Sequence, residues 1–564
     1  MPQDAFTLKY LCAELNDLLK GGKVNRVVQP SNDAVVLTIY TGKGTEKLLL
    51  DSDPSSPKIG IIERETESPL TAPNFCMLLR KHLLSATVKE ISLVGFDRIV
   101  KLDFVSSSEF FGGSVKTIYA ELMGRYSNVI LTENGKILGG NRGINMLGVG
   151  VRPLIVGCDY VFPPTQNKKL PSDKSIAEDL RSFVGEDLPS FLASDISGIA
   201  LSTAKEMTER YKKVTGKTAI KTSDAEDFYS FIKEFLLNAK PNPCVTVNGE
   251  NVTDVFVLPY ETVADEKKYF DKLYKAEEYY YDKREKTKKF LSLKERLTNV
   301  TNAALKKAKK RLSAIKTKER AAADLESDRI KGEILLANVY KIKGNETEVT
   351  LDNYYDGGVI TIELDNRISP AKNSENYFKK YAKKKRALVS ISEQKEIAEK
   401  EAEYFESVTD FISMATEIED LNGIKEELTL NGALKEKTDV RKKRVERKFR
   451  EYLIDGVSVK LGRNNLENDE LLSLSKGEYT WLHAKDYHSS HVIIEKNEVK
   501  DSVLKTAAEI CAYYSKGREG GKTEIVYTLK KHVKKPPSAK AGFVVYTDYK
   551  SIFVFPDKHE NQLK

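Results

Sequence analysis

Cysteine is scarce in this chain of 564 residues, and tryptophan occurs once. The five cysteines lie far apart and never form a C-x-x-C pair, so we expect neither a disulfide framework nor a cysteine zinc site. A reducing cytoplasm fits this usage best. No run of about 18 apolar residues occurs, so no membrane span is expected. The N-terminus lacks a basic segment followed by an apolar run, so no signal peptide is expected.

The sequence also lacks the usual catalytic signatures. It contains no P-loop, no G-x-G-x-x-G after a predicted strand and no G-x-S-x-G. Of the six histidines, only His483, His488 and His491 cluster, and their spacing matches no familiar zinc site. A turn at a sheet edge explains this trio more simply. We therefore expect no catalytic residue, no metal and no cofactor.

Charge is what the sequence has in abundance, since 31% of residues are charged and the formal net charge is +8. The positive charge is concentrated in three runs, Leu305–Arg320, Phe378–Arg386 and Val440–Arg450. Such runs predict phosphate contacts, although any single run could equally be a solvated coiled-coil face. Three runs in one chain favour RNA or DNA as the partner. The candidate contacts on the first two are Lys306, Lys309, Lys310, Arg311, Lys383 and Lys384.

Two long stretches without glycine or proline, Tyr260–Lys331 and Ala371–Asn422, predict a helical hairpin. Apolar residues recur in them at three–four spacing, which is typical of coiled-coil packing. At about 1.5 Å per residue, the first helix would reach roughly 100 Å. We expect an arm over residues 260–438 with a β-rich tip at about 338–370. The apolar stripe is assigned to packing, not to chemistry.

Three further domains are expected from the length and the patterning. Residues 1–170 show a mixed α/β pattern, with a helix over Phe6–Lys20 followed by short strands. Residues 171–259 change to helical patterning. The glycine of the hairpin Asp195–Ile199 could let a backbone approach a phosphate, or the hairpin could be a plain packing joint. Residues 439–564 are predicted to form a compact α/β domain, with a strand over Tyr452–Leu461 and a helix over Asp501–Lys516.

Two segments of the first domain are candidates for nucleic-acid contacts. Asp97 and Arg98 stand at the predicted start of a strand, where neighbours point to opposite faces. One of them could contact RNA while the other braces the loop, or the two could form a loop salt bridge. The second segment is a glycine turn with an arginine, a tyrosine and small polar donors, which suits a phosphate or base contact or a plain strand-to-strand turn. From it we select Glu121, Arg125, Ser127 and Asn128.

The last domain is expected to present a basic, partly aromatic surface suited to structured RNA. The candidates are a run of donors after a strand, the only tryptophan with its neighbours, and a basic loop stiffened by prolines. They are Arg463, Asn464, Asn465, Trp481, His483, Lys485, His491, Lys534 and Lys535.

These segments resemble the NFACT family, in order over essentially the whole chain. The N-terminal likeness is carried by Asn74–His82, Gly95–Arg98, Glu121–Asn128 and Tyr160–Pro164. The likeness of the middle and the C-terminal part is carried by Leu335–Asn338, Asn373–Tyr381, Gly462–Asn465, Trp481–Lys485, Ser490–Val492 and Lys534–Pro536. Two positions depart from the pattern: His488-Ser489 stands where the family commonly has Pro-Gly, and Asp4-Ala5 where it often has Asp-Gly.

The resemblance implies a multidomain α+β fold. It consists of a glycosylase-like α/β domain, a helix-hairpin-helix domain, a long antiparallel coiled-coil arm with a small β tip, and a C-terminal α/β RNA-binding domain. The resemblance also implies binding to rRNA of large (50S) ribosomal subunits that are obstructed by peptidyl-tRNA. Alanyl-tRNA would be recruited there, so that stalled chains receive a C-terminal alanine tail and are degraded.

The family resemblance also assigns roles and partners. Asp97 and Arg98 match the acid–arginine pair that the family needs for tRNA engagement. The ribosome itself would form the peptide bond, so the chain is expected not to be an enzyme. A small ribosome-associated protein and fibronectin are further partners that the resemblance suggests.

Two other classes of function stay open. A DNA glycosylase is suggested by fold similarity and by Pro2, whose amine could attack a sugar carbon. Those enzymes place an acid next, where this chain has Gln3, and their zinc cysteines are missing. A surface adhesin that binds fibronectin would need an unconventional export route.

Overall fold

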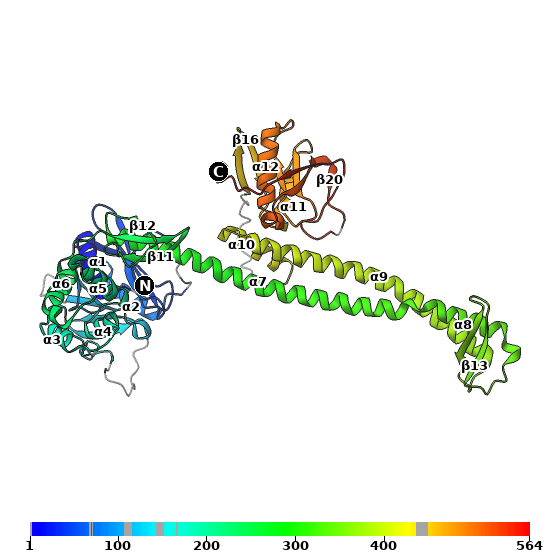
Figure 1. Ribbon diagram of the computed structural model, residues 1–564, viewed down its shortest axis with the longest axis horizontal. Coiled ribbons are helices and arrows are strands. Elements are labelled where there is room, and N and C mark those ends of the chain that lie inside the picture. Colours follow the sequence, from blue (N-terminus) through cyan, green and yellow to red (C-terminus); the bar gives the residue numbers. More distant parts are fainter. Residues whose placement is uncertain are drawn as a thin grey trace. The chain divides into compact units, whose positions relative to one another are not determined.

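The computed structural model describes residues 3–564 except 67, 68, 70, 107–114, 143–151, 153, 165, 166, 436–448 and 538. The chain divides into two compact units, Met1–Thr287 and Lys288–Lys564, whose elements are labelled in Figure 1. The predicted basic run Val440–Arg450 lies almost wholly outside the described residues. Within them, no helix is long and apolar enough to cross a membrane.

The first unit is built on a nine-stranded antiparallel sheet of order β4-β3-β2-β1-β5-β6-β7-β8-β9. Helix α1 (Ala5–Leu19) begins where the Asp4 carboxylate accepts the Thr7 N–H, and it packs against β5. Helix α2 (Asn74–Leu83) packs against β1 and β9. The strands are β1 Lys23–Val28, β2 Ala34–Tyr40, β3 Thr45–Asp51, β4 Lys58–Ile61, β5 Thr87–Leu93, β6 Ile99–Val105, β7 Val115–Glu121, β8 Asn128–Glu133 and β9 Lys136–Gly140.

Four helices and a small sheet complete the first unit. Their apolar residues, such as Ile176, Met207 and Phe228, join one core with α1 and the large sheet. The predicted domains 1–170 and 171–259 therefore share a hydrophobic core. The helices are α3 Ser175–Ser182, α4 Leu188–Asp195, α5 Leu201–Thr215 and α6 Ala225–Asn238, and the small sheet holds β10 Cys244–Asn248, β11 Asn251–Phe256 and β12 Glu266–Tyr269.

The predicted arm is present, with a later start than expected. Residues 266–269 pair as β12, so the first long helix, α7, runs over Leu273–Ala323, and its 51 residues span about 77 Å. Asp324 separates it from α8. The tip holds the expected hairpin, which turns at Gly357. The remaining arm elements are α8 Leu325–Ala337, β13 Glu348–Asn353, β14 Gly358–Glu363, α9 Pro370–Met414 and α10 Ile418–Leu430.

Helices α7 and α9 form an antiparallel pair (Figure 1). Leu297 of α7 is fully buried in a cluster with Val408 of α9. Ion pairs flank this seam, among them Lys309–Glu406 at 2.6 Å and Lys395–Glu319 at 2.9 Å. As the residue numbers rise along α7, those of the ion-pair partners on α9 fall, as expected for two antiparallel helices.

The C-terminal part carries a six-stranded antiparallel sheet of order β15-β16-β18-β17-β19-β22. Helix α12 packs on one face and α11 on the other. The single strand predicted over Tyr452–Leu461 is wrong, because Asp455 and Gly456 adopt positive φ and turn it into a hairpin. The elements are β15 Arg450–Ile454, β16 Val457–Leu461, α11 Asn465–Leu474, β17 Thr480–Ala484, β18 Val492–Ile494, α12 Asp501–Tyr513, β19 Thr523–Leu529, β20 Val533–Lys534, β21 Val545–Tyr546 and β22 Lys550–Val554.

The second turn of α7 begins with a fully buried acid, Glu277, which accepts a hydrogen bond from the Gln3 amide. Burial raises the pKa of this carboxyl from 4.5 to about 8. The fold therefore favours the neutral acid, and stability is lost as pH rises from about 4.5 to about 8. We expect Glu277→Gln to remove this loss. The difference in free energy of unfolding between the variant and the parent should then grow in favour of the variant by up to about 4 kcal/mol from pH 5 to pH 8.

Thermal unfolding of the full chain between pH 5 and pH 8 measures this difference. The control is Glu226→Gln, which makes the same change at an exposed side chain on α6 and should leave the pH profile of the parent unchanged. A Glu277→Gln profile parallel to that of the parent would show that the carboxyl is not held neutral.

Candidate nucleic-acid interface

Asp97 and Arg98 lie in the turn between β5 and β6, not in the strand as predicted, because β6 begins at Ile99. The rule that neighbouring side chains of a strand point to opposite faces therefore does not apply to them, and it cannot assign one to RNA and the other to the loop. The Asp97 carboxylate accepts a hydrogen bond from the Arg98 backbone N–H at 2.7 Å and so shapes the turn. Within the part of the chain that the structure describes, the half-buried Arg98 guanidinium forms no ion pair. The proposed loop salt bridge is absent there, and this guanidinium is available to a phosphate.

The hairpin glycine Gly198 supports this turn from behind. It has φ +71°, and a Cβ at this position would lie 2.4 Å from the Phe96 carbonyl oxygen and from the Ala5 Cβ. The Gly198 carbonyl accepts the Ala5 N–H at 2.7 Å. The glycine therefore allows the close approach to Phe96 and Ala5 that the packing-joint interpretation expects.

Gly198→Ala is expected to displace the turn that carries Asp97 and Arg98. The matched control is Gly216→Ala, because Gly216 has φ +69° and no atom lies within 4 Å of its added Cβ. Both variants carry the strain of a left-handed residue, on the order of 1–2 kcal/mol, and only Gly198→Ala adds the clash. Hydrogen exchange at residues 95–98 should rise in Gly198→Ala alone. Equal exchange in the two variants would show that the close approach does not hold the turn.

A second arginine, Arg125, is exposed and lies at the same end of the sheet. Arg125 belongs to a short 3-10 turn, Gly124–Tyr126, between β7 and β8, and its guanidinium stacks over the Tyr126 ring at 4.7 Å. The ring itself is 68% exposed. The Arg98 carbonyl accepts the Leu122 N–H at 2.8 Å, so the turns bearing the two arginines are neighbours. Together they offer two cations and one stacking ring.

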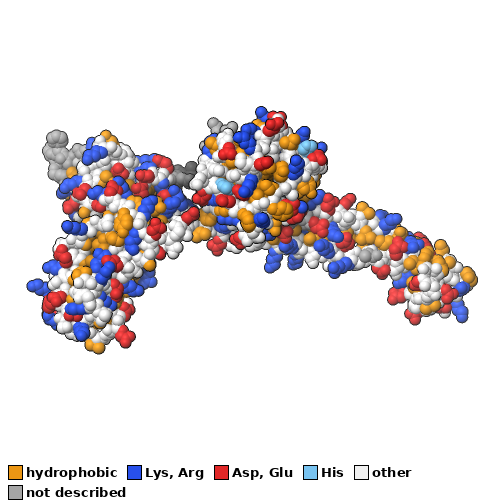
Figure 2. All heavy atoms as spheres, turned by 45° about the horizontal axis from the view of Figure 1, so that its top comes forward, with side chains coloured by type: hydrophobic (Ala, Val, Ile, Leu, Met, Phe, Trp, Pro, Cys, Tyr) orange, Lys and Arg blue, Asp and Glu red, His pale blue; other side chains and the backbone are white. Residues whose placement is uncertain are grey.

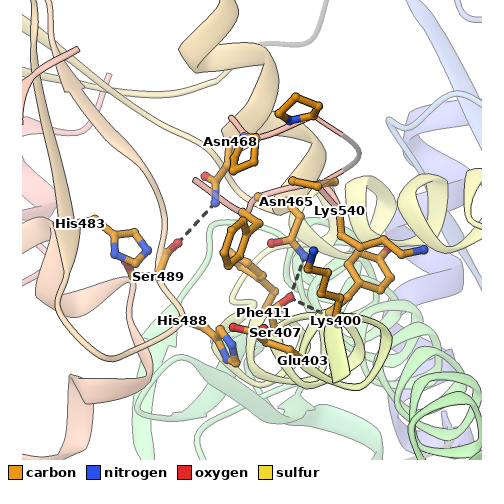
Figure 3. Close-up of a pocket in the computed structure, with 17 residues that line it drawn as sticks. Lys400, Glu403, Ser407, Phe411, Asn465, Asn468, His483, His488, Ser489 and Lys540 are labelled. Carbon is orange, nitrogen blue, oxygen red and sulfur yellow. Dashed lines mark hydrogen bonds between the residues drawn. The ribbon is translucent and has the colours of Figure 1, made fainter. Parts of the chain in front are cut away.

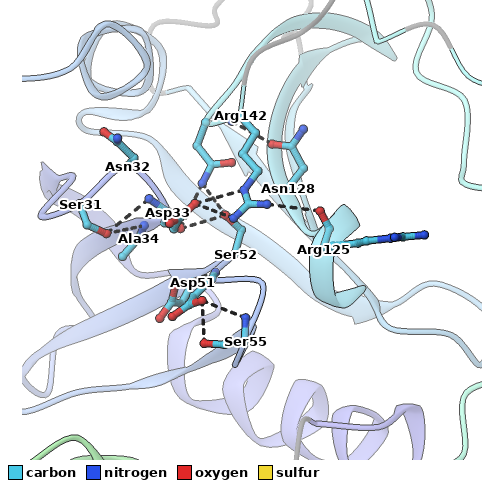
Figure 4. Close-up of polar contacts among 12 residues, drawn as sticks. Ser31, Asn32, Asp33, Ala34, Asp51, Ser52, Ser55, Arg125, Asn128 and Arg142 are labelled. Carbon is cyan, nitrogen blue, oxygen red and sulfur yellow. Dashed lines mark hydrogen bonds and ion pairs between the residues drawn. The ribbon is translucent and has the colours of Figure 1, made fainter. Parts of the chain in front are cut away.

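Arg142, which the sequence patterns did not single out, holds the Arg125 turn (Figure 4). Its guanidinium donates to the Asp33 carboxylate at 2.7 Å and to the Arg125 carbonyl at 3.4 Å. Its backbone N–H donates to the Asn128 side chain at 3.2 Å. The turn after β1 and the turn before β8 are thereby joined. An isolated arginine in a loop carries no sequence signal for such a role.

Three of the predicted tRNA contacts lie inside the protein. Glu121 is 2% exposed, and its carboxylate accepts hydrogen bonds from Arg152 and from the Tyr160 hydroxyl, each at 2.6 Å. Burial, followed by the Glu121 charge, raises the pKa of Tyr160. Ser127 and Asn128 are 1% and 6% exposed. Their assignment as direct contacts is corrected to support of the Arg125 turn, because their side chains do not reach the surface.

The basic residues of the arm divide into paired and unpaired groups. Lys309 and Arg311 form ion pairs with acids of α9, and Lys384 pairs at 2.7 Å with Asp328, so their charges are partly neutralised. Among the described residues, exposed Lys306, Lys310 and Lys383 have no ion-pair partner. Figure 2 shows basic and acidic side chains mixed along the arm.

The run of donors after β16 also faces inwards. Asn464 caps α11 by accepting the Glu467 N–H at 3.0 Å. The Asn465 amide donates to Glu427 at 2.9 Å and to Ser407 at 3.0 Å. Arg463 has a side chain 16% exposed, close to Asp420. The prediction that these asparagines present donors to RNA is wrong, because both are buried: Asn464 caps α11, and Asn465 attaches α11 to the arm.

The aromatic candidates of this domain are buried as well. Trp481 and His491 are 0% and 1% exposed, and Trp481 stacks on His483 at 5.6 Å. Neither provides a surface on which a base could stack, so both predictions are corrected. Of the remaining candidates, Lys485 pairs with Glu524, Lys535 pairs with Asp469, and Lys534 is exposed on β20.

Comparison with known proteins identifies two family domains in this chain. Residues 4–447 match the family described as NFACT N-terminal and middle domains, and residues 447–541 match the NFACT protein RNA binding domain. The N-terminal of the fibronectin/fibrinogen-binding protein from Streptococcus suis is a structural neighbour, with a TM-score of 0.42 and 24% identity. That alignment covers 50% of this chain and 98% of the neighbour.

Two relatives align over nearly the whole chain. The Rqc2 homolog RqcH of Bacillus subtilis (strain 168) is 32% identical over 566 residues, which cover 96% of each chain. The Rqc2 homolog RqcH of Streptococcus suis (strain 05ZYH33) is 29% identical over 569 residues, covering 99% of this chain and 98% of the relative. With both matched domains in the family's order, the chain belongs to the NFACT family.

Proposed function

We propose that this protein acts in ribosome quality control. It binds large ribosomal subunits obstructed by peptidyl-tRNA and recruits alanyl-tRNA, and the stalled chain receives a C-terminal alanine tail that leads to its degradation. The observation that carries this proposal is the pair of neighbouring turns with Arg98 and Arg125 in a chain of the NFACT family. Peptide bond formation is left to the ribosome, so the residues here bind and position RNA.

The two kinds of basic surface support different contacts. Arg98, Arg125 and the Tyr126 ring combine phosphate binding with base stacking, which suits a folded tRNA. Lys306, Lys310 and Lys383 are exposed on regular helices, where they suit the phosphate backbone of rRNA. Lys534 extends the basic surface in the second unit. We assign the first group to tRNA and the rest to rRNA.

The test is to purify the full chain from its cells and to sequence the RNA bound to it. Large-subunit rRNA and enriched alanine tRNA are expected. Raising the salt concentration should release both, because phosphate contacts exchange for counterions. A preparation that contains neither RNA would contradict the proposal, and enrichment of another tRNA would contradict the alanine assignment.

A further inference from the structure

A pocket of about 100 Å³ opens in the second unit, where α9, α11, the β17–β18 turn and the loop 536–543 meet (Figure 3). The rings of Tyr404, Phe411 and Phe543 line it, and His483 and Asn468 line its polar side. In Figure 3, His483, Ser489 and Asn468 lie across the pocket from Lys400 and Glu403. The pocket therefore has flat aromatic walls, with polar side chains on two opposite sides.

Fixed contacts hold these walls in place. The chain on either side of residue 538 is fastened to Asp469, by the Lys535 ammonium at 2.5 Å and by the Gly542 N–H at 3.1 Å. Gly542 has φ +80°, and an added Cβ would lie 2.2 Å from the Asn465 side chain. The His488 ring contacts Asp410 of α9 at 2.6 Å. The pocket is thus a built feature and not a gap between loosely packed parts.

The chemistry of the lining suits a flat heterocycle. Burial lowers the pKa of His483 to about 4, so at pH 7 the ring is neutral, with one donor and one acceptor nitrogen. The volume is of the same order as the roughly 150 Å³ cavity that accepts benzene. Lys540 places its ammonium 5.7 Å from the Tyr404 ring. A cation beside the opening favours an occupant that is attached to a phosphate.

We propose that this pocket takes one unpaired nucleobase of an RNA, stacked on the aromatic walls with its polar edge toward His483 and its phosphate toward Lys540. The inference rests on the proposed function, since it names the part of the RNA that this domain reads. A base inside a duplex cannot enter, because it would first have to leave its stack. The site therefore selects single-stranded nucleotides over paired ones.

The test compares two matched phenylalanines of the same domain. Phe543 lines the pocket and is 41% exposed, whereas Phe553 lies outside the pocket lining on β22 and is 62% exposed. The probes are an eight-nucleotide oligouridine and a blunt-ended RNA duplex, titrated against the full chain. Phe543→Ala should weaken binding of the oligouridine about tenfold, because one base loses its stacking partner. Phe553→Ala should change it less than twofold, and neither variant should alter duplex binding.

Phe543→Tyr keeps a flat ring and should restore binding of the oligouridine. Fluorescence of the buried Trp481 checks that each variant folds. Unchanged oligouridine binding in Phe543→Ala, or an equal loss in Phe553→Ala, overturns the proposal. If co-purified rRNA and alanine tRNA persist in that case, the proposed function stands and only the base pocket fails. If the parent chain retains no RNA at all, both fail together.

Discussion

Replacing both Asp97 and Arg98 by alanine should abolish alanine tailing while the chain still folds. The change removes the guanidinium that has no ion-pair partner among the described residues, and also the carboxylate that shapes its turn. Charge-assisted hydrogen bonds contribute about 1.5–3 kcal/mol each, so losing two of them corresponds to roughly a hundredfold or more. Mass spectrometry of a stalled reporter chain gives the tail length directly.

The control for this variant removes another acid–arginine pair from the same unit. Arg181 and Glu226 form an exposed ion pair on α3 and α6, away from the two arginine turns. Alanine at both positions should leave tailing at the parental level. Asp97→Asn keeps an oxygen that can accept the Arg98 N–H, so it should retain more tailing than the double variant. Normal tails in the double variant would remove Asp97 and Arg98 from the mechanism.

Removing the Arg450 side chain should strongly destabilise the C-terminal part. Its guanidinium, 4% exposed, donates to both Asp420 oxygens at 3.0 and 3.1 Å and lies 4.4 Å from the Tyr514 ring. Arg450→Ala leaves the Asp420 carboxylate buried without this partner, which costs about 3–5 kcal/mol. Urea unfolding followed by fluorescence of Trp481, the only tryptophan, reports on this domain alone.

Lys309→Ala is the matched control, because it breaks an ion pair that is open to water, with side chains 57% and 42% exposed. It should scarcely move the urea midpoint. If Arg450→Ala shifted the midpoint no more than Lys309→Ala, the buried pair would not be what attaches β15 to α10.

Local signals were sufficient for most of the secondary structure. Hydrophobic spacing located α1 and α12 within a few residues, and glycine turns located the hairpin at the tip. The stretch Ala371–Asn422 was predicted as one helix, but α9 ends at Met414 and α10 begins at Ile418. Two further elements were misread where local signals compete. The short strand β12 is as free of glycine and proline as the helix that follows it. The turn at Asp455-Gly456 interrupts an apolar run that continues on both sides.

Which polar residues face solvent could not be predicted in this way. Asn465 begins α11 shortly after β16 and Lys534 lies on β20, yet the first is hydrogen-bonded to Glu427 and the second is exposed. The difference depends on the approach of α10, which lies far away in the sequence. Trp481 was expected at the surface for the same reason, since its burial depends on α11 and on strand β21, which carries Tyr546. A resemblance to a family motif indicates that a segment matters, but it does not tell which of its side chains are buried and which are exposed.

The ion pairs between α7 and α9 restrict how the length of the arm can change during evolution. One residue inserted into α9 alone would rotate all that follows by about 100° and part Lys395 from Glu319. An insertion of seven residues in both helices keeps the seam in register and moves the tip by about 10 Å. Relatives with longer or shorter arms should therefore differ by the same number of heptads on the two sides of the β13–β14 hairpin. The length of the arm would then change during evolution only in steps of about 10 Å.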